Sequence, residues 1–249
     1  GKVGNGGCIY CSSLGSGDFA GNVKDDLITQ FNKIKEQMNH KWHGKYIGYF
    51  QANTNTYAPV SVLKEKFEPI LKLSNVIGLS IATRPDSISD ECFDYLIDLN
   101  KRTYLTVELG LQTIHEKTSE LINRCHTLEC FEECVKRLRK NKIAVVVHLI
   151  NGLPYETKEM MLENITYLNK LDIQGIKIHM LHILKNTKLE KMYKEQPFKI
   201  LTEQEYVNIV CDQLELLNPD IVVHRLTGDP DPNNLIEPTW LTNKMVVLN

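Results

Sequence analysis

One repeating unit of the fold is visible in residues 143–182, IAVVVHLINGLPYETKEMMLENITYLNKLDIQGIKIHMLH. Residues 143–150 and 175–182 are rich in β-branched side chains, which is typical of strands, and residues 157–170 between them have apolar positions at helical spacing. A strand, a helix and a second strand joined in this way form a βαβ unit, in which the two strands lie parallel. This stretch therefore predicts an α/β fold built on a parallel sheet.

The same alternation extends over most of the chain. Further strands are predicted at 45–52, 76–83, 105–112 and 221–227, and further helices at 24–41, 59–73, 89–102, 115–124, 127–141 and 203–217. Six strands with intervening helices fit either an open doubly wound sheet or a barrel, complete or partial. We predict a partial (βα)6 TIM-like barrel with parallel strands over residues 1–220, and a small C-terminal extension over residues 221–249 that packs on it.

Composition limits the class of protein. The 249 residues are 42% hydrophobic and 24% charged, which supplies enough apolar side chains for a sizeable core. The formal net charge of −2 gives no overall attraction to nucleic acid or to an anionic membrane, so either partner would need a local patch. The sequence contains neither an apolar stretch of about 20 residues nor a signal peptide, and we predict a cytoplasmic protein with no membrane partner.

Seven cysteines in such a chain favour metal binding or catalysis over a disulfide framework. Residues 4–11, GNGGCIYC, place Cys8 and Cys11 three positions apart in a glycine-rich loop, a spacing that lets both sulfurs reach one ion or cluster. The pair also fits a zinc half-site or a thioredoxin-like redox pair. A zinc site needs two further ligands, which are not evident, and a thioredoxin motif would open a helix, whereas residues 12–17 continue as loop.

The remaining cysteines are interpreted mainly as core residues. Cys130 and Cys134 share a helix face at i,i+4 spacing and, with Cys125, could form an auxiliary cluster. Unpaired cysteine is more often a small buried side chain, and we favour that reading. The same interpretation applies to Cys92 and Cys211.

Polar segments follow the predicted strands at 51–56, 83–86, 112–113, 151–156 and 182–187. Both open α/β sheets and barrels carry their chemistry at the carboxyl ends of the strands. We therefore expect the functional residues of this chain to come from these segments and from the cysteine loop.

Residues 6–21, GGCIYCSSLGSGDFAG, resemble the cluster-binding loop of radical S-adenosylmethionine (SAM) proteins, in a bacterial branch related to the catalytic subunit of Elongator. Other segments resemble this branch in the expected order: YFQANTNTYAP at 49–59, ATRPD at 82–86, ELGLQT at 108–113, INR at 122–124, GLPYET at 152–157, KIHMLHILKNT at 177–187 and HRLTGD at 224–229. The resemblance implies a [4Fe–4S] cluster with three cysteine ligands. Two of them would be Cys8 and Cys11, and the third is expected just upstream of Gly1, so that the chain given begins after it.

The resemblance also implies a reaction. An electron from the reduced cluster would cleave SAM and give a 5′-deoxyadenosyl radical that abstracts hydrogen from the substrate. A donor such as flavodoxin or ferredoxin would supply that electron. Kinship with the Elongator catalytic subunit implies tRNA as substrate, with conversion of a carboxymethylaminomethyl group on the wobble uridine to aminomethyl. The alternatives are a non-catalytic RNA- or partner-binding barrel and a zinc or redox protein that uses the C-x-x-C pair alone.

By the same resemblance, seven residues are predicted to contact SAM: Gln51, Asn53, Thr54, Glu108, Gln112, Arg124 and His148. The first three carry over by position alone, because glycines of the superfamily's usual turn are absent here. Glu108 and Gln112 could instead be polar side chains of the barrel interior, and Arg124 could instead cap the end of its helix. His148 occupies a position where relatives often hold an acidic ribose ligand.

Three further residues are predicted to contact substrate: His179, His182 and Lys185. Together with His148, the two histidines lie on adjacent predicted strands and could bind a second metal or shuttle protons. A hydrogen-bonded histidine of the barrel interior is commoner than a metal ligand, so contact with substrate or cofactor is the preferred interpretation.

Overall fold

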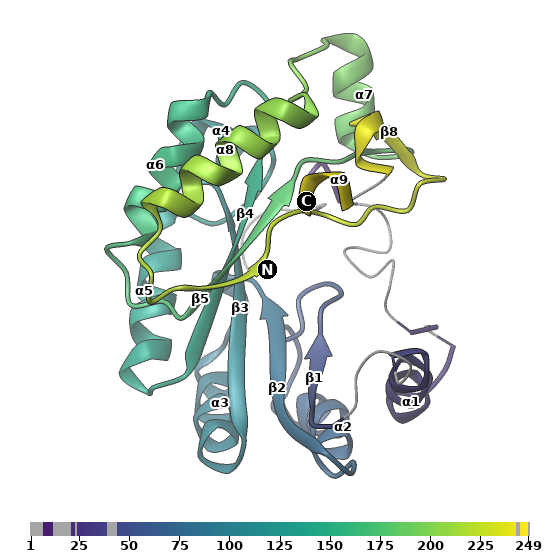
Figure 1. Cartoon of the computed structure of the whole chain (residues 1–249). Helices are drawn as coiled ribbons and strands as arrows, with labels where there is room; N and C mark the ends of the chain where they lie inside the picture. The colour runs from purple at the N-terminus through teal and green to yellow at the C-terminus, as the bar shows by residue number, and fades with distance from the viewer. Residues whose placement is uncertain (1–6, 12–20, 23, 39–43, 243–244, 249) are drawn as a thin grey trace.

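Six parallel strands form the frame of the molecule, and Figure 1 shows them curling into a half-barrel. The computed structural model describes residues 7–11, 21–22, 24–38, 44–242 and 245–248. The strands are β1 (Tyr46–Phe50), β2 (Val76–Thr83), β3 (Tyr104–Gln112), β4 (Ala144–Asn151), β5 (Gly175–Met180) and β7 (Val222–Arg225). They pair in the order β1-β2-β3-β4-β5-β7, and every pair is parallel. The predicted α/β partial barrel is therefore confirmed.

Helices connect the strands, and most of them cover the convex face of the sheet (Figure 1). They are α1 (Leu27–Met38), α2 (Val60–Leu71), α3 (Asp90–Arg102), α4 (Glu116–Leu121), α5 (Leu128–Lys140), α6 (Lys158–Leu168) and α8 (Glu203–Leu216). Each lies inside the range predicted for it, although residues 39–41 of the first predicted helix lie outside the described residues. At α8, Thr202 and Glu205 form a capping box that fixes the start of the helix.

Helix α4 is shorter than the predicted 115–124. It ends at Leu121, because Asn123 adopts a left-handed φ of 56° and Cys125 one of 65°, and a left-handed residue ends a helix. The chain then turns so that Arg124 is almost fully buried, with 2% of its surface exposed. Its guanidinium bonds to carbonyls outside α4, which differs from the helix-capping alternative considered for this residue.

Several short elements were not predicted. Two of them are the strands β6 (Ile183–Leu184) and β8 (Leu235–Glu237), which pair antiparallel. The others are the short helices η1 (Pro85–Ser87), α7 (Lys188–Glu195), η2 (Thr239–Thr242) and α9 (Met245–Leu248). Strands of two or three residues are too short to show a hydrophobic period, and β6 and β8 are set by pairing between segments about 50 residues apart in the chain. The β6–β8 pair and α7 lie above the carboxyl ends of the sheet (Figure 1).

Because side chains alternate along each strand, the sheet has one apolar face and one polar face. On β4, Val145, Val147 and Leu149 are buried against the helices, as are their counterparts on the neighbouring strands. The intervening positions of the sheet carry Glu108, His148 and other polar residues on the concave face. The helices therefore bury the apolar half of each strand and leave the polar half facing the interior of the half-barrel.

The cysteines outside the cysteine loop differ in how deeply they are buried. Cys92 and Cys134 are buried, as predicted, whereas Cys125 and Cys130 are partly buried. The prediction for Cys211 was wrong: this residue is exposed, because α8 buries the opposite face, which carries Tyr206, Ile209, Val210 and Gln213. No helix in the described parts of the chain is long and apolar enough to cross a membrane.

Candidate functional site at the carboxyl ends of the strands

A cavity of about 620 Å³ opens at the carboxyl ends of the strands. Its wall contains ten of the twelve residues singled out from the sequence: Cys8, Cys11, Gln51, Asn53, Thr54, Glu108, Gln112, Arg124, His148 and His179. The other two, His182 and Lys185, do not line it. Since segments far apart in the chain meet here, the fold brings the cysteine loop and the predicted cofactor residues to one place, while their individual roles stay predictions.

The cysteine loop is held to the rest of the molecule by its backbone. Ile9 donates its N–H to the carbonyl of Ile122 at 3.1 Å and accepts from the N–H of Leu189 at 2.9 Å. The side-chain amide of Asn123 donates to the Gly7 carbonyl at 2.6 Å. Ile9 and Tyr10 also pack on a small apolar cluster beneath the loop, composed of Ile122, Ile150, Leu153, Leu181, Ile183, Leu189 and Phe198. The unpredicted helix α7 and the left-handed turn after α4 thus position both cysteines.

The two thiols face each other beside two arginines. A hydrogen bond from Cys11 lowers the pKa of Cys8 to about 6 against the opposing effect of burial, and the charges of Arg84 and Arg124 lower it further. The same hydrogen bond, together with burial, raises the pKa of Cys11, so the pair loses its first proton easily and its second with difficulty. Thiolate rather than thiol binds metal, and Cys8 is therefore the readier iron ligand of the two. The paired sulfurs and the nearby positive charge therefore fit an iron–sulfur cluster. Within the described residues, no group of three or more His, Cys, Asp or Glu side chains is arranged to hold a metal ion.

The loop after β1 is held in place by Asn55, which was not among the predicted site residues. The amide of Asn55 donates to the Phe50 carbonyl at 2.9 Å and to the Ala82 carbonyl at 3.0 Å, tying the exit of β1 to β2. The backbone of Asn53 is left-handed, with φ of 62°. This geometry presents Gln51, Asn53 and Thr54 to the cavity, although the segment lacks glycine.

The end of β3 is irregular where Gln112 lines the cavity. The register with β4 slips between Gly110 and Gln112, and Gln112 has a left-handed φ of 67°. Its side-chain nitrogen would lie only 2.7 Å from a Cβ at position 110, so the Gln112 side chain folds over Gly110 in space that only glycine leaves open. The bulge directs Gln112 into the cavity.

Arg124 holds the segments around this bulge together. Its Nε donates to the His126 carbonyl at 2.9 Å, and Nη1 donates to the carbonyls of Leu111 and Thr113. Nη2 lies 3.4 Å from Glu116 Oε1. Most of its donors are therefore used within the protein, although the residue also forms part of the cavity wall.

Deeper in the cavity, five polar residues from five strands form a single network around Glu108, which we call the Glu108 network: Tyr49, Ser80, Glu108, His148 and Lys177. Oε1 of Glu108 accepts from Ser80 Oγ at 2.6 Å. Oε2 accepts from Tyr49 OH at 2.9 Å, from His148 Nε2 at 2.7 Å and from Lys177 Nζ at 2.6 Å. Four donors thus surround one carboxylate that is 3% exposed.

Electrostatics keeps Glu108 ionised. Burial alone would raise the pKa of Glu108, but the hydrogen bonds and charges of His148 and Lys177 outweigh it and hold the pKa well below its usual value. Burial lowers the pKa of His148, against the opposing contact with Glu108, and it also lowers the pKa of Lys177. With both oxygens already accepting from the protein, Glu108 acts in this structure as a fixed counter-ion, and its predicted contact with SAM stays a prediction.

The three predicted substrate residues are placed differently from one another. The His179 ring lies 5.2 Å from that of His148, and its Nε2 is buried without a hydrogen-bond partner. His182 packs its ring against Gly228, where an added Cβ would approach it to 2.2 Å. Lys185 donates to the Asn233 carbonyl at 2.7 Å, beside the β6–β8 pair. Of these three, only His179 faces the cavity.

Sequence reasoning missed Tyr49, Ser80, Lys177 and Arg84. Lys177 carried a usable signal, since a lysine between apolar residues in the middle of a predicted buried strand requires a partner. The partner, Glu108, is 69 residues away and could not be paired with it without the order of the strands. Arg84 and Asp86 form a two-pronged ion pair at 2.9 Å beside the cysteine loop, within the ATRPD segment that had been noted only for its resemblance.

Comparison with known families gives two matches that together cover almost the whole chain. A model described as the radical SAM superfamily matches residues 2–168, and one described as the radical SAM C-terminal domain matches residues 173–249. The YtqA protein of Bacillus subtilis is 56% identical over 249 residues, which is all of this chain and 77% of that protein.

Two further relatives are named for their action on tRNA or as Elongator proteins. The tRNA uridine(34) acetyltransferase of Methanocaldococcus jannaschii is 28% identical over 156 residues, covering 61% of this chain and 28% of that protein. The structure of the archaeal Methanocaldococcus infernus Elp3, lacking its N-terminal residues, superposes with a TM-score of 0.74 and 19% identity over 85% of this chain and 55% of that one. At that identity the superposition shows a shared fold.

Proposed function

This chain belongs to the radical SAM superfamily, and on that premise we propose that it converts a carboxymethylaminomethyl group on the wobble uridine of tRNA to an aminomethyl group. It is a radical SAM enzyme, whose cofactors are a [4Fe–4S] cluster and SAM. The observation that carries the choice of substrate is the similarity to a tRNA uridine(34) acetyltransferase over 61% of this chain. The shared fold with an archaeal Elp3 supports the same choice.

In the proposed arrangement, Cys8 and Cys11 hold the cluster together with a cysteine from outside the chain given. When bound, the cluster and SAM would supply a 5′-deoxyadenosyl radical that can remove a hydrogen atom from the carboxymethyl CH2 of the substrate. Loss of one further electron from that carbon, addition of water and cleavage of the C–N bond would release the two carbons as glyoxylate and leave the aminomethyl group, with SAM, cleaved to methionine and 5′-deoxyadenosine, as the oxidant. Arg84 and Arg124 offset the negative charge of the thiolates, since both charges act on Cys8. The apolar cluster under Ile9 and Tyr10 keeps the loop in place against the strand ends.

Residues of the strand exits are proposed to bind SAM. Gln51, Asn53 and Thr54 present amide and hydroxyl groups from one side of the cavity, and Gln112 presents an amide from the bulge of β3. These neutral groups suit the ribose hydroxyls and the amino and carboxylate groups of the cofactor. Arg124 supports this wall by tying three backbone carbonyls together, and His148 lies below it.

The protein is proposed to work in the cytoplasm, where tRNA is found, with an electron donor such as flavodoxin or ferredoxin. The formal net charge of −2 means that tRNA must be held by a local site rather than by a general attraction. A base that reacts inside a cavity also has to leave its stack, as in other enzymes that act on a base. Recognition is therefore expected to centre on the anticodon loop, where bases are unpaired.

The proposal is tested in cells and with purified components. Transfer RNA from a strain lacking the gene should accumulate carboxymethylaminomethyluridine at the wobble position, as measured by mass spectrometry of nucleosides, and the intact gene should restore aminomethyluridine. The purified enzyme from the complete gene, reconstituted anaerobically and supplied with SAM and a reductant, should make the same conversion and release 5′-deoxyadenosine. An unchanged nucleoside profile would remove tRNA as the substrate.

A further inference from the structure

The polar interior of the half-barrel holds more positive than negative charge. Glu108 is the only carboxylate of the Glu108 network, and it forms an ion pair with Lys177 at 2.6 Å. A second cation, Arg225, lies directly beside this pair, because residues 177 and 225 are partners in the ladder between β5 and β7. Among the described residues, no carboxylate lies within ion-pair distance of Arg225, so its charge is not balanced by a partner as that of Lys177 is.

Arg225 lines a second pocket on β7 and the segment after it, and from there its charge acts on groups of the half-barrel interior. Burial lowers the pKa of His148 and of His179, and the charge of Arg225 lowers both further. The same charge opposes the rise that burial causes in the pKa of Tyr49. These three residues come from β1, β4 and β5, so the charge of Arg225 affects pKa values across the concave face and not only beside the edge strand.

An unused hydrogen-bonding group lies at the same place. His179 lines the cavity, and its Nε2 is buried without a partner. Leaving a polar atom buried and unpaired costs about 1–3 kcal/mol, so such atoms in a cavity wall usually meet a ligand or water. The neighbouring His148 already donates to Glu108, whereas His179 has its bonding capacity available.

His148, which is itself a predicted SAM contact, and Lys177 lie below the strand exits that carry Gln51, Asn53, Thr54 and Gln112. His148 lies three positions before Asn151 at the end of β4, and Lys177 lies three positions before Met180 at the end of β5. With a rise of about 3.3 Å per residue, this places His148 and Lys177, whose ladder partner is Arg225, about 10 Å below the strand ends, whereas His179, one position before Met180, lies about 3 Å below them. A substituent projecting from a base can extend to that depth, whereas the phosphates of a folded RNA loop remain at the mouth of the cavity.

We propose that Arg225 and His179 bind the carboxylate of the carboxymethylaminomethyl group, with Lys177 and Glu108 holding the neighbouring positions in place. This inference rests on the proposed function, and it assigns to the substrate end of the cavity two residues with unmet bonding capacity. Arg225 supplies a charge-assisted hydrogen bond and His179 a neutral one. The aminomethyl product carries no carboxylate, so the same subsite favours its release.

The test measures binding without turnover. The holoenzyme, with oxidised cluster and SAM but no reductant, is titrated with three synthetic anticodon stem-loops that carry carboxymethylaminomethyluridine, aminomethyluridine or unmodified uridine at the wobble position. Fluorescence anisotropy gives each Kd. The wild-type protein should bind the first RNA about tenfold tighter than the other two, the size expected for one charge-assisted hydrogen bond.

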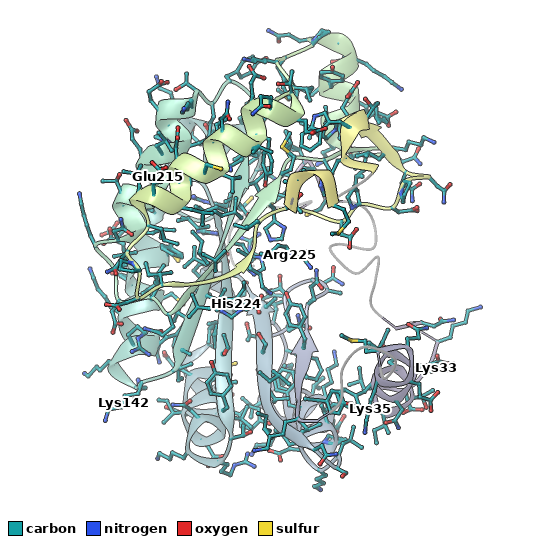
Figure 2. All side chains as sticks on the ribbon, viewed as in Figure 1. Lys33, Lys35, Lys142, Glu215, His224 and Arg225 are labelled. Atoms are coloured by element: carbon teal, nitrogen blue, oxygen red, sulfur yellow. The ribbon has the colours of Figure 1, made fainter. Side chains whose placement is uncertain are left out.

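Two variants and a matched control locate the effect. Arg225→Gln should abolish the preference without changing the Kd for unmodified RNA, and Arg225→Lys should retain part of it, since the charge is kept. Lys142→Gln removes an exposed cation that Figure 2 shows at the outer edge of the molecule, away from Arg225, and it should behave as wild type. Absorbance of the cluster reports that each variant is folded and loaded.

The possible outcomes separate the two proposals. If Arg225→Gln weakens all three RNAs by one factor, Arg225 binds backbone phosphate and the carboxylate subsite is wrong. If the variant keeps the preference while wild type converts the carboxymethylaminomethyl RNA, the subsite is wrong and the proposed function stands. If wild type shows neither preference nor conversion, the proposed function fails and the subsite fails with it.

Discussion

The mouth and the floor of the cavity are built on different principles. At the mouth, two side chains bond within the protein: Asn55 bonds two carbonyls and ties the exit of β1 to β2, and Arg124 bonds three and ties the turn after α4 to the end of β3. They support the wall from which Gln51, Asn53, Thr54 and Gln112 face the cavity. At the floor, the Glu108 network is also bonded within the protein, but Arg225 and the Nε2 atom of His179 lack partners among the described residues. A saturated wall has one stable shape, whereas unsaturated groups are available to a ligand.

This difference corresponds to what each region has to recognise. SAM and the cluster are common to the superfamily, and a mouth fixed by internal bonds can hold them in one geometry. In the proposed function the substrate meets the floor, which carries the charged residues Glu108, Lys177 and Arg225. The following predictions test whether the mouth is rigid and the floor adaptable.

The largest effect is expected at the cysteine loop. Cys8→Ala or Cys11→Ala should remove the cluster and reduce 5′-deoxyadenosine formation to the background of the assay, because a cluster iron would lose a thiolate ligand. Cys211→Ala is the matched control, since Cys211 is exposed on α8 and distant from the loop in the fold. Absorbance and iron content check the cluster, and an unaltered cluster in Cys8→Ala would contradict the site.

Arg124→Gln should lower the free energy of unfolding by about 3 kcal/mol, since three buried carbonyls lose their charged donor. Urea denaturation of the cluster-free protein measures this effect apart from the cofactor. Arg102→Gln provides the comparison, because Arg102 is an exposed partner of Glu68 and Asp98 and such surface pairs contribute less than about 1 kcal/mol. Equal losses in the two variants would show that the mouth does not depend on Arg124.

His126 at the mouth and His179 in the cavity allow the two regions to be compared directly. Burial, followed by the charge of Arg124, lowers the pKa of His126 to about 4 from 6.5, and its Nε2 lies 3.0 Å from the Gly110 carbonyl. Burial likewise lowers the pKa of His179. Because the unfolded chain takes up these protons first, stability should fall as the pH drops below 6.5 towards 4.

Replacing either histidine with glutamine should make that fall shallower, by up to about 1.4 kcal/mol per pH unit. At pH 7.5 the two variants should differ: His126→Gln loses a bond at the mouth and about 1 kcal/mol, whereas His179→Gln loses none. Urea denaturation at a series of pH values measures both effects. A loss at pH 7.5 in His179→Gln as large as that in His126→Gln would contradict the distinction between mouth and floor.

The sequence predicted the frame more fully than the site. The strands and the main helices carried hydrophobic periods, and each was found where it was expected, whereas β6, β8 and α7 depend on long-range contacts that leave no period. Of the ten candidate residues that line the cavity, Gln51, Asn53, Thr54 and Gln112 come from strand exits, which converge in a parallel sheet, and the others come from the strands themselves, the cysteine loop and the turn after α4. Arg225 was not singled out, since its position opposite Lys177 follows from a register shift between β5 and β7 that the sequence does not reveal.

The smallest expected effect concerns how far the floor can adjust. A Cβ added at Gly175 would lie 2.5 Å from Nε2 of His224, the end of an exposed side chain that can rotate away, so Gly175→Ala should cost about 1 kcal/mol. A Cβ at Gly78 would lie 2.3 Å from the backbone carbonyl of Tyr104, which cannot move without disturbing the pairing of β2 with β3, and Gly78→Ala should cost about 3 kcal/mol. Urea denaturation of both variants measures the difference. If Gly175→Ala costs as much as Gly78→Ala, the side chains of His224 and Val146 are held in place, and the floor beside Arg225 is as rigid as the paired backbone of β2 and β3.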